Sequence, residues 1–351
     1  MERKNQYNII SEGEISIEAP DIYFTRGPGS RTAGFYNMDQ KLNRDITISF
    51  LKAVKPKLAL DAFGGTGIRG LRIEKEAGVR TVISELNKKS FQYIEENKAL
   101  NGSNAEIYRK SFQAVLNDYL FDYIDIDPYG SVLPYLDDTI MNLRNRGYFG
   151  VTATDLTALT GSMPVKTKRR YNARIINDTF RHESGIRLLI SAVVQRAAAM
   201  DIAAMPMLSL WHSHYYRVIF RIQRSASMAD NQLENIGLYN RNISMDPLCN
   251  NYNEGPLWLG KLNSYGINNL KLVDNPDKLL LKYMERMAND DLSLYFMDLA
   301  ETAQLRGRDS ISINSSIKLL EESGIKAGRT QFSETGIKVD GAIQDAIKIL
   351  Y

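Results

Sequence analysis

The sequence contains a single cysteine, Cys249, among its 351 residues. One thiol excludes a disulfide within the chain and a zinc site made of several cysteines. Histidine is also scarce, since His182, His212 and His214 are the only three, and no cluster of acidic residues accompanies them. Histidines in such a setting most often lie in cores or on surfaces, and we predict no bound metal.

Long apolar runs are absent as well, although hydrophobic residues make up 44% of the chain. No stretch is long enough to span a membrane, and residues 1–8 are charged and polar with no apolar segment after them, unlike a signal peptide. We therefore expect a cytoplasmic protein that does not bind membranes. Because single cores usually stop growing at roughly 250 to 300 residues, we expect a chain of this length to form two domains.

The net charge is only +3, but the charge is unevenly distributed. Residues 166–196 carry eight Lys or Arg and two acids, a charge of +6, which leaves −3 for the rest of the chain. Such a concentration is typical of a phosphate-binding surface, although a solvated helix face has the same composition. The candidate phosphate contacts are Lys166, Lys168, Arg169, Arg170 and Arg174.

Residues 121–130 combine a strand pattern with functional groups at its end. Phe121 to Ile126 alternates like a buried strand, and Asp127, Pro128 and Tyr129 follow at once. In open α/β sheets, ligands bind at the carboxyl ends of the strands. We therefore predict that Asp127, Pro128 and Tyr129 belong to a binding site. Alternatively, Asp127 caps the next helix.

A second feature of this kind is the glycine-rich loop of residues 64–67, which follows a predicted strand at residues 58–63 and precedes a helix. Glycines permit positive backbone angles and let a ligand approach the main chain, where the helix offers free N–H groups. Another strand, residues 81–85, ends in Glu85, 24 positions after Asp61. A carboxylate at this spacing grips the ribose of a nucleoside, so we predict a nucleoside-containing cofactor.

The order of predicted elements favours one kind of α/β sheet. Strands are predicted at 58–63, 81–85, 105–110, 121–126 and 148–154, with helices at 87–101, 111–119, 133–146 and 174–200 among those between and after them. Strands at 205–211 and 214–222 are separated by only two residues, which permits a hairpin and not a parallel crossover. This order is typical of Rossmann-like class I methyltransferases, and it disfavours a nicotinamide-dependent dehydrogenase. Residues 1–35 show no periodicity.

The chain after Arg224 looks like a second domain. We predict a methyltransferase domain at residues 1–224 and a domain of mixed α and β structure at residues 225–351. Within the latter, a helix is predicted at 277–306, a helix pair at 310–325 and a strand at 329–333. A small winged-helix-like module at the end fits this order.

The chemistry of Asp127 suits methylation of an exocyclic amine. The lone pair of such a nitrogen is delocalised into the ring, and a carboxylate that accepts its N–H hydrogen bond draws the amine toward tetrahedral geometry. Pro128 stiffens the loop, and Tyr129 offers a ring on which a base stacks, an interaction worth roughly 1 to 3 kcal/mol. Phe35 and Tyr36 stand just ahead of a predicted helix, where an aromatic pair usually serves packing.

Together these motifs resemble the tRNA (guanine-26-N2)-dimethyltransferase family, especially its archaeal members. The likeness covers nearly the whole chain. It rests on Glu12-Gly13, Phe35-Tyr36-Asn37, Asn43-Arg44-Asp45, Asp61-Ala62, residues 66–70, residues 125–131, residues 151–155, His214-Tyr215-Tyr216-Arg217, residues 255–260 and residues 332–338.

The resemblance implies S-adenosylmethionine as methyl donor and guanine N2 at position 26 of tRNA as acceptor. It implies that Asp127 engages the guanine amine, that Phe35 and Tyr129 sandwich the base, and that residues 225–351 bind RNA. The donor contacts that the resemblance implies are Arg44, Asp61, Arg69 and Glu85. From the glycine loop we add Gly64, Thr66 and Gly67. Where the family usually has an Asp-Ala pair that contacts the adenine, this chain has Ser111-Phe112, and we include these two residues among the predicted donor contacts.

Position 26 lies inside the folded tRNA, so we expect the enzyme to extrude the base from its stack. We expect a monomer that does not act on DNA. Two other functions remain open at this point: an amino-methyltransferase acting on adenine or cytosine of DNA, which also places an Asp/Asn-Pro-aromatic motif after the fourth strand, and a non-catalytic tRNA-binding protein.

Overall fold

The computed structural model describes residues 7–20, 33–240 and 253–351, so Cys249 lies outside the described residues. The chain divides into two compact units. The first comprises residues 1–154, 212–225 and 269–280, and the second comprises residues 155–211, 226–268 and 281–351. The division into separately folding domains at residue 224 stays a prediction.

A twisted sheet supplies the parallel strands of the first unit, and only its strand β8 falls in the second unit among the described residues. Its strands run in the order β5-β4-β3-β6-β7-β9-β8, where β3 to β7 pair in parallel and β9 runs antiparallel to β7. The predicted α/β sheet that closes with an antiparallel hairpin is therefore confirmed. The strands are β3 (Leu58–Asp61), β4 (Arg80–Ser84), β5 (Glu106–Tyr108), β6 (Phe121–Ile126), β7 (Leu143–Ala153), β8 (Ile202–His212) and β9 (Tyr215–Arg224).

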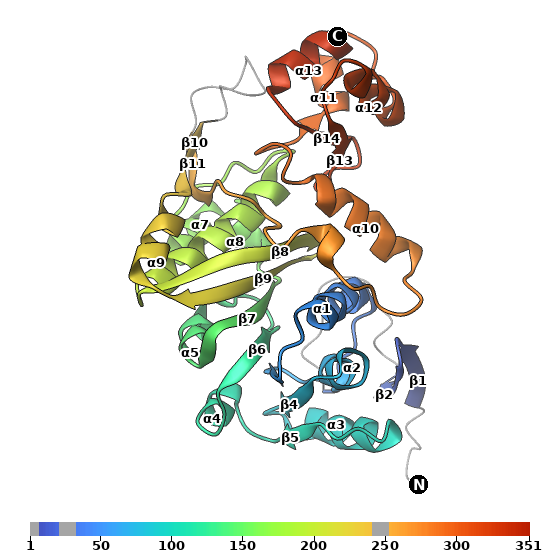
Figure 1. Ribbon diagram of the computed structural model, residues 1–351, viewed down its shortest axis with the longest axis vertical. Coiled ribbons are helices and arrows are strands. Elements are labelled where there is room, and N and C mark those ends of the chain that lie inside the picture. The colour runs from blue at the N-terminus through green and yellow to red at the C-terminus, as the bar shows by residue number, and fades with distance from the viewer. Residues whose placement is uncertain (1–6, 21–32, 241–252) are drawn as a thin grey trace. The chain divides into compact units, whose positions relative to one another are not determined.

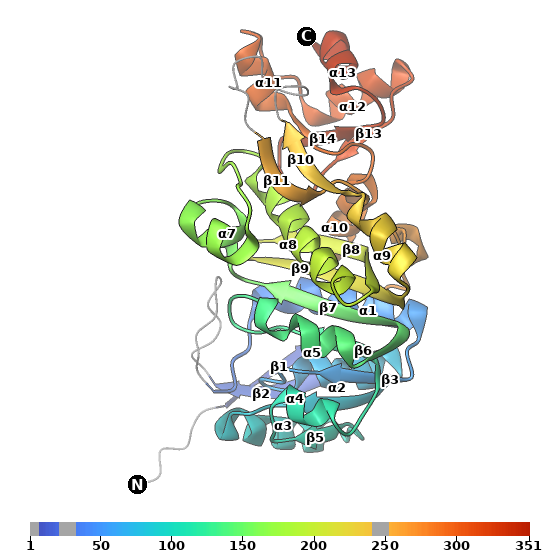
Figure 2. The ribbon, with the colours of Figure 1, turned by 90° about the vertical axis from the view of Figure 1, so that its left-hand side faces the viewer.

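Helices cover both faces of this sheet. In Figures 1 and 2, α1, α2 and α3 lie on one face and α4 and α5 on the other. Because helices cover both faces, Leu60 of β3 and Ile124 of β6 are fully buried. Parallel strands that are covered on both faces need apolar residues on both. The helices are α1 (Lys41–Val54), α2 (Ile68–Ala77), α3 (Lys88–Leu100), α4 (Phe112–Leu116) and α5 (Leu136–Met141), with short 3-10 turns at Met38–Gln40 and Leu133–Tyr135.

An N-terminal hairpin, β1 (Tyr7–Glu12) and β2 (Ile15–Pro20), stands in the stretch that showed no periodicity. Its β2 strand alternates after all, because Ile15, Ile17 and Ala19 are buried in one cluster with Ile68, Leu71 and Ile94. Six residues of alternation are too short a signal within a polar segment, and this hairpin was missed.

Two helix predictions in the middle of the chain were wrong in extent. The helix predicted at 133–146 ends at Met141, and β7 starts at Leu143. The helix predicted at 174–200 begins only at Arg181, as α8 (Arg181–Ala198). A separate helix, α7 (Pro164–Tyr171), precedes it, and the residue that caps its C-terminus, Asn172, has a left-handed φ of 49°.

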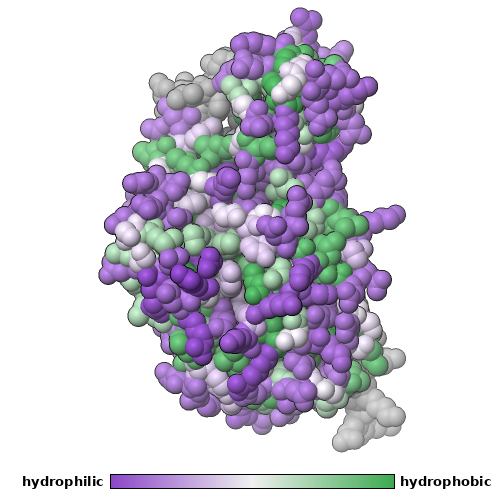
Figure 3. All heavy atoms as spheres, in the orientation of Figure 1, coloured by the Kyte–Doolittle hydropathy of each residue, from purple (hydrophilic) through white to green (hydrophobic). Residues whose placement is uncertain are grey.

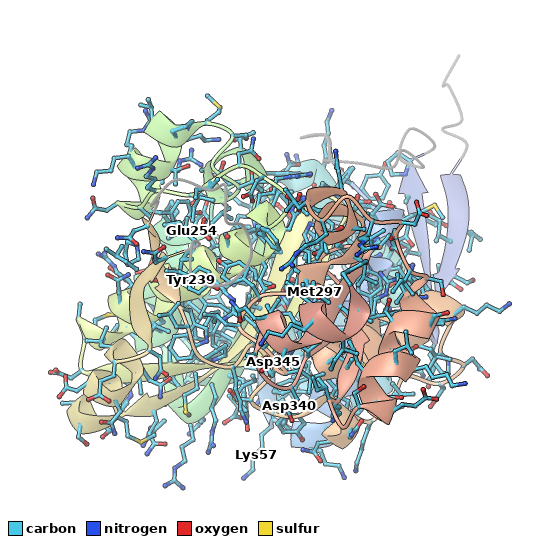
Figure 4. The ribbon with its side chains drawn as sticks, turned by 90° about the horizontal axis from the view of Figure 1, so that it is seen from above. Lys57, Tyr239, Glu254, Met297, Asp340 and Asp345 are labelled. Carbon is cyan, nitrogen blue, oxygen red and sulfur yellow. The ribbon has the colours of Figure 1, made fainter. Side chains whose placement is uncertain are left out.

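The second unit also contains α6 (Leu156–Leu159), α9 (Ala226–Leu233) and the strand pair β10 (Ile236–Asn240) and β11 (Asn253–Trp258). Tyr239 and Glu254, labelled in Figure 4, are paired in register on these two strands. The Glu254 carboxylate accepts hydrogen bonds from Ser184 of α8 and from Tyr295. These contacts join three distant stretches of the chain into one unit.

The carboxy-terminal predictions need three corrections. The helix predicted at 277–306 is α10 (Lys278–Asn289), β12 (Met297–Asp298) and α11 (Leu299–Leu305), because Asp290 and Asp291 bond to other segments and end α10. The helix pair predicted at 310–325 is the single helix α12 (Ile313–Glu322). The strand predicted at 329–333 is β13 (Ala327–Arg329), which pairs with β14 (Gly336–Val339) ahead of α13 (Ile343–Leu350).

These strands form a three-stranded sheet in the order β12-β14-β13. Its core joins Met297, Leu320, Ile337 and Ala346. The winged-helix-like module stays a prediction. On the face that Figure 3 shows, hydrophilic residues surround smaller hydrophobic patches. Among the described residues, no helix is long and apolar enough to cross a membrane.

Candidate functional site

A cavity of about 460 Å³ lies within the first unit, at the carboxyl ends of β3, β4, β6 and β7. Residues from the glycine loop, from the tip of β6 and from the stretch before α1 share its wall. Nine of the predicted site residues line it: Phe35, Arg44, Gly64, Thr66, Arg69, Glu85, Asp127, Pro128 and Tyr129. The cavity thus brings the predicted donor side and the predicted base side together.

Asp127 lies at the tip of β6 with its side chain one-fifth exposed. Its Oδ2 accepts a hydrogen bond from Nη2 of Arg69 at 2.5 Å. Burial raises the pKa of Asp127 above its ordinary value, and the positive charge of Arg69 opposes this effect. Arg69, which the resemblance assigned to the donor, therefore also binds the predicted catalytic carboxylate.

Arg69 is itself held from two other sides. Its Nη1 donates to Oδ1 of Asn43 at 3.0 Å, and its Nε lies 3.4 Å from Oδ1 of Asp125. Asp125 is fully buried and is fixed by Arg217 and by the Tyr123 hydroxyl. These contacts fix the position of Arg69, and Arg69 in turn orients the carboxylate of Asp127.

The two rings expected to hold a base are neighbours in the cavity wall. The ring centroids of Phe35 and Tyr129 lie 6.1 Å apart, and the ring planes are inclined by 54°. To stack on both faces of a base, two rings must be parallel and leave room for the base between them. The rings of Phe35 and Tyr129 would therefore have to turn and separate before a base could enter. Tyr129 is 51% exposed, and Gly130 after it has a φ of 91°.

The glycine loop suits a nucleoside donor. Gly64 allows the loop to pack against Ile83, since a Cβ at Gly64 would lie 2.6 Å from that side chain. Glu85 at the end of β4 accepts a hydrogen bond from the Gly65 N–H at 2.9 Å while lining the cavity. Thr66 Oγ1 is buried without a hydrogen-bond partner among the described residues. A polar ligand in the cavity would give that hydroxyl a partner, so the residues present fit a nucleoside.

Four predicted donor contacts do not line the cavity. Asp61 is buried and accepts from the Gly70 N–H, and burial raises its pKa to about 7. Gly67 caps α2 with a φ of 84°. Ser111 caps α4, and Phe112 packs against Phe63, which does line the cavity. The roles of these four residues toward the donor stay predictions.

Comparison with known proteins identifies the family. The family model described as N2,N2-dimethylguanosine tRNA methyltransferase matches residues 13–351. The chain belongs to this family. It is 44% identical over 345 residues to the tRNA (guanine(26)-N(2))-dimethyltransferase of Thermoplasma volcanium, covering 97% of this chain and 98% of that protein. It is 43% identical over 334 residues to the same enzyme of Thermoplasma acidophilum, covering 95% and 94%.

A solved structure, Trm1 from Pyrococcus horikoshii with S-adenosyl-L-methionine, matches with a TM-score of 0.83 and 26% identity. The match covers 98% of this chain and 99% of that chain. The predicted family and the class I methyltransferase fold are thereby confirmed.

Several cavity residues of this N2,N2-dimethylguanosine tRNA methyltransferase family member were not predicted. Asn37 and His214 both line the cavity, and Nδ2 of Asn37 lies 3.2 Å from Nε2 of His214. Burial lowers the pKa of His214, while the charges of Asp39 and Asp127 act in the opposite direction. The signal was present in the sequence, because both residues stand in motifs that carried the family resemblance.

The predicted basic surface is only partly a free surface. On α7, Lys166 lies 2.6 Å from Asp155 and Arg170 pairs with the same carboxylate, whereas Lys168 and Arg169 are exposed. Arg174 is exposed and pairs through its backbone with Gly255. Arg187 of α8 is buried, with Glu183 as its ion-pair partner.

Proposed function

We propose that this chain transfers methyl groups from S-adenosylmethionine to the exocyclic N2 of guanine 26 in tRNA, giving N2-methyl- and N2,N2-dimethylguanosine. The relatives at 44% and 43% identity carry the name of this reaction, and the solved neighbour is a complex with S-adenosyl-L-methionine. The observation that carries the proposal is the single cavity in which Asp127, the glycine loop and Glu85 meet.

On the donor side, Gly65, Thr66 and Glu85 hold the nucleoside, and Arg44 holds the carboxylate of the amino-acid end. Glu85 accepts from the ribose hydroxyls, as a carboxylate at the end of the second strand does in nucleotide-binding sheets. S-adenosylmethionine supplies an electrophilic methyl group on a positively charged sulfur and leaves as a neutral thioether.

On the acceptor side, Asp127 accepts a hydrogen bond from the guanine amine and aims the nitrogen lone pair at the methyl group. Arg69 keeps Asp127 in place and favours its ionised, accepting form. Phe35 and Tyr129 stack on the two faces of the base after their rings separate. We propose that the exposed ring of Tyr129 is the one that moves.

The base must leave its stack inside the tRNA, which costs a few kcal/mol and is offset by stacking in the pocket. We propose that residues 225–351 and the exposed cations Lys168, Arg169 and Arg174 hold the tRNA backbone. Recognition of folded RNA depends on shape and phosphates more than on base edges. We further propose that the protein is cytoplasmic and monomeric.

A labelled methyl donor incubated with tRNA transcript or with duplex DNA tests the reaction. We expect label in tRNA. Asp127→Asn should lower the single-turnover rate by about 100-fold or more with donor binding kept. Asp122→Asn is the matched control, since Asp122 lies on the same strand and its carboxylate binds the backbone of Lys57 and Leu58. Label in DNA and not in tRNA, or full activity of Asp127→Asn, would contradict the proposal.

A further inference from the structure

Glu12, at the end of β1, lies in a cluster of buried charges behind the cavity. Its Oε1 accepts from Nε of Arg44 and from Nη1 of Arg72, both at 2.6 Å. Its Oε2 accepts from Nη2 of Arg44 at 2.6 Å and from the Tyr36 hydroxyl at 2.7 Å. Glu12 is only 2% exposed, so its carboxylate is bound by protein groups and shielded from solvent.

Two of these partners, Arg44 and Tyr36, line the cavity, and Glu12 does not. Arg44 also donates from Nη2 to the Asn37 carbonyl at 3.1 Å. Its Nε and Nη2 are therefore engaged, and its Nη1 has no hydrogen-bond partner among the residues that the structure describes. Burial alone would raise the pKa of Glu12, but Arg44 and Arg72 outweigh it and lower the pKa to about 2. Glu12 is ionised at neutral pH.

The turn after Glu12 is shaped to fit against α2. Gly13 has a φ of +60°, and a Cβ there would lie 2.1 Å from the Glu76 carboxylate. Glu76 accepts from the Glu14 N–H at 3.3 Å and from Nε of Arg72 at 2.6 Å. The pair Glu12-Gly13, whose role the family resemblance left open, thus docks the hairpin on the helix that follows the glycine loop.

A second tie connects the same hairpin to the glycine loop. Asn97 of α3 accepts from the Glu18 N–H at 2.6 Å and donates to the Thr66 carbonyl at 2.9 Å. Figure 1 shows β2 beside α2 and α3, in agreement with the contacts between these elements. The hairpin therefore contacts the cavity wall at Arg44 and, through Asn97, at Thr66.

We infer that Glu12 is a positioning residue for the methyl donor: it fixes the guanidinium of Arg44 so that Nη1 meets the donor's carboxylate. This inference rests on the proposed function. An arginine side chain is long and flexible, and a planar guanidinium held at two of its nitrogens presents the third in one direction. The hairpin is then part of the donor site although it contributes no residue to the cavity wall.

The test compares two ligands by calorimetry. S-adenosylmethionine has the amino-acid carboxylate, and methylthioadenosine has the same nucleoside and sulfur without the amino-acid portion. Glu12→Gln should weaken S-adenosylmethionine binding by about tenfold or more, as expected for the loss of a charge-assisted hydrogen bond, and leave methylthioadenosine binding within about twofold. Asp45→Asn is the matched control, because Asp45 is a buried carboxylate that binds Arg72 in the same cluster and pairs with neither Arg44 nor the hairpin among the described residues. It should leave both affinities near those of the wild type.

A double variant isolates the route through Arg44. Arg44→Gln should produce the same ligand-selective loss, and adding Glu12→Gln should cause no further loss. If Glu12→Gln does not fold, Glu12→Asp, which keeps the charge but is one methylene shorter, replaces it with the same expectation. Equal weakening of both ligands, unchanged or tighter S-adenosylmethionine binding, or additive losses would overturn the inference. Binding needs no acceptor, so this outcome is separate from whether the wild type methylates tRNA.

Discussion

Two carboxylates of β6, Asp125 and Asp127, stand two positions apart and have opposite surroundings. Asp125 is fully buried, and although burial would raise its pKa, Arg217 and Arg69 lower it below the ordinary value. For Asp127, burial outweighs Arg69 and raises the pKa. The first is a fixed structural anion, and the second, with its side chain one-fifth exposed, is the carboxylate that we propose accepts from the substrate amine while Arg69 holds it in place.

We therefore predict that Arg69 sets the acid side of the pH profile of methyl transfer. The positive charge of Arg69 acts to lower the pKa of Asp127, so removal of Arg69 should raise that pKa further. Arg69→Gln should shift the acid limb of the single-turnover rate, measured at saturating donor, to higher pH. An unshifted limb would show that Arg69 does not act on Asp127.

The Glu12 cluster predicts a pH dependence of stability. The pKa of Glu12 in the folded protein, about 2, lies below the ordinary glutamate value of 4.5, so ionised Glu12 contributes about 3 kcal/mol to the stability at neutral pH. That contribution is present above pH 4.5 and is lost as the pH falls toward 2. In urea unfolding, Glu12→Gln should be less stable than the wild type at pH 7, and the difference should shrink between pH 4.5 and pH 2. A difference that stays constant over this range would contradict the account.

At the scale of elements, the strands buried on both faces were predictable and the short elements outside the central sheet were not. The run Phe121 to Ile126 is β6 as predicted, because its apolar residues leave little choice of structure. The strands β1 and β2 have six residues each and the helix α7 has eight. In elements this short, tertiary contacts such as that of Glu12 with Arg44 determine the structure. Sequence patterns do not record these contacts.

The same division applies to the site. Residues at strand ends, such as Asp127 and Glu85, were predictable because parallel strands carry their ligands at that edge. Asn37 and His214 reach the cavity from a loop and from a hairpin turn, and no local pattern shows where such a segment folds back. The pairing of Arg69 with Asp127 was missed for the same reason.

Helix α7 allows a test of the phosphate contacts. Lys168 and Arg169 are exposed, whereas Lys166 and Arg170 are paired with Asp155. Reversing the charge of Lys168 and Arg169 together should weaken tRNA binding and reduce the slope of log affinity against log salt by roughly two, about one per phosphate contact.

The control is charge reversal at Lys55 and Lys57, two exposed lysines just before β3. They lie at the amino end of this strand, whereas the cavity lies at its carboxyl end. Lys57 is labelled in Figure 4. The control pair should leave the salt slope unchanged. An equal effect of both pairs would show a general charge effect and no specific contact by α7.

At the scale of the whole molecule, the second unit gathers three separate stretches of chain. Glu183 of α8 is paired with Lys338, and Arg187 donates to the carbonyls of Trp258 and Leu294. At least one cation of the basic segment 166–196, Arg187, is therefore buried and helps to join the three stretches of the second unit. Composition alone assigned all of that charge to a surface.

The central claim concerns one atom of one base in tRNA. The most direct measurement is mass spectrometry of nucleosides and of mapped fragments from one tRNA transcript after incubation with the protein and methyl-labelled S-adenosylmethionine. The account predicts N2-methyl- and N2,N2-dimethylguanosine at position 26 with the wild type and neither with Asp127→Asn. Label on another base, at another atom of guanine, or at other positions with guanine 26 unmodified would contradict it.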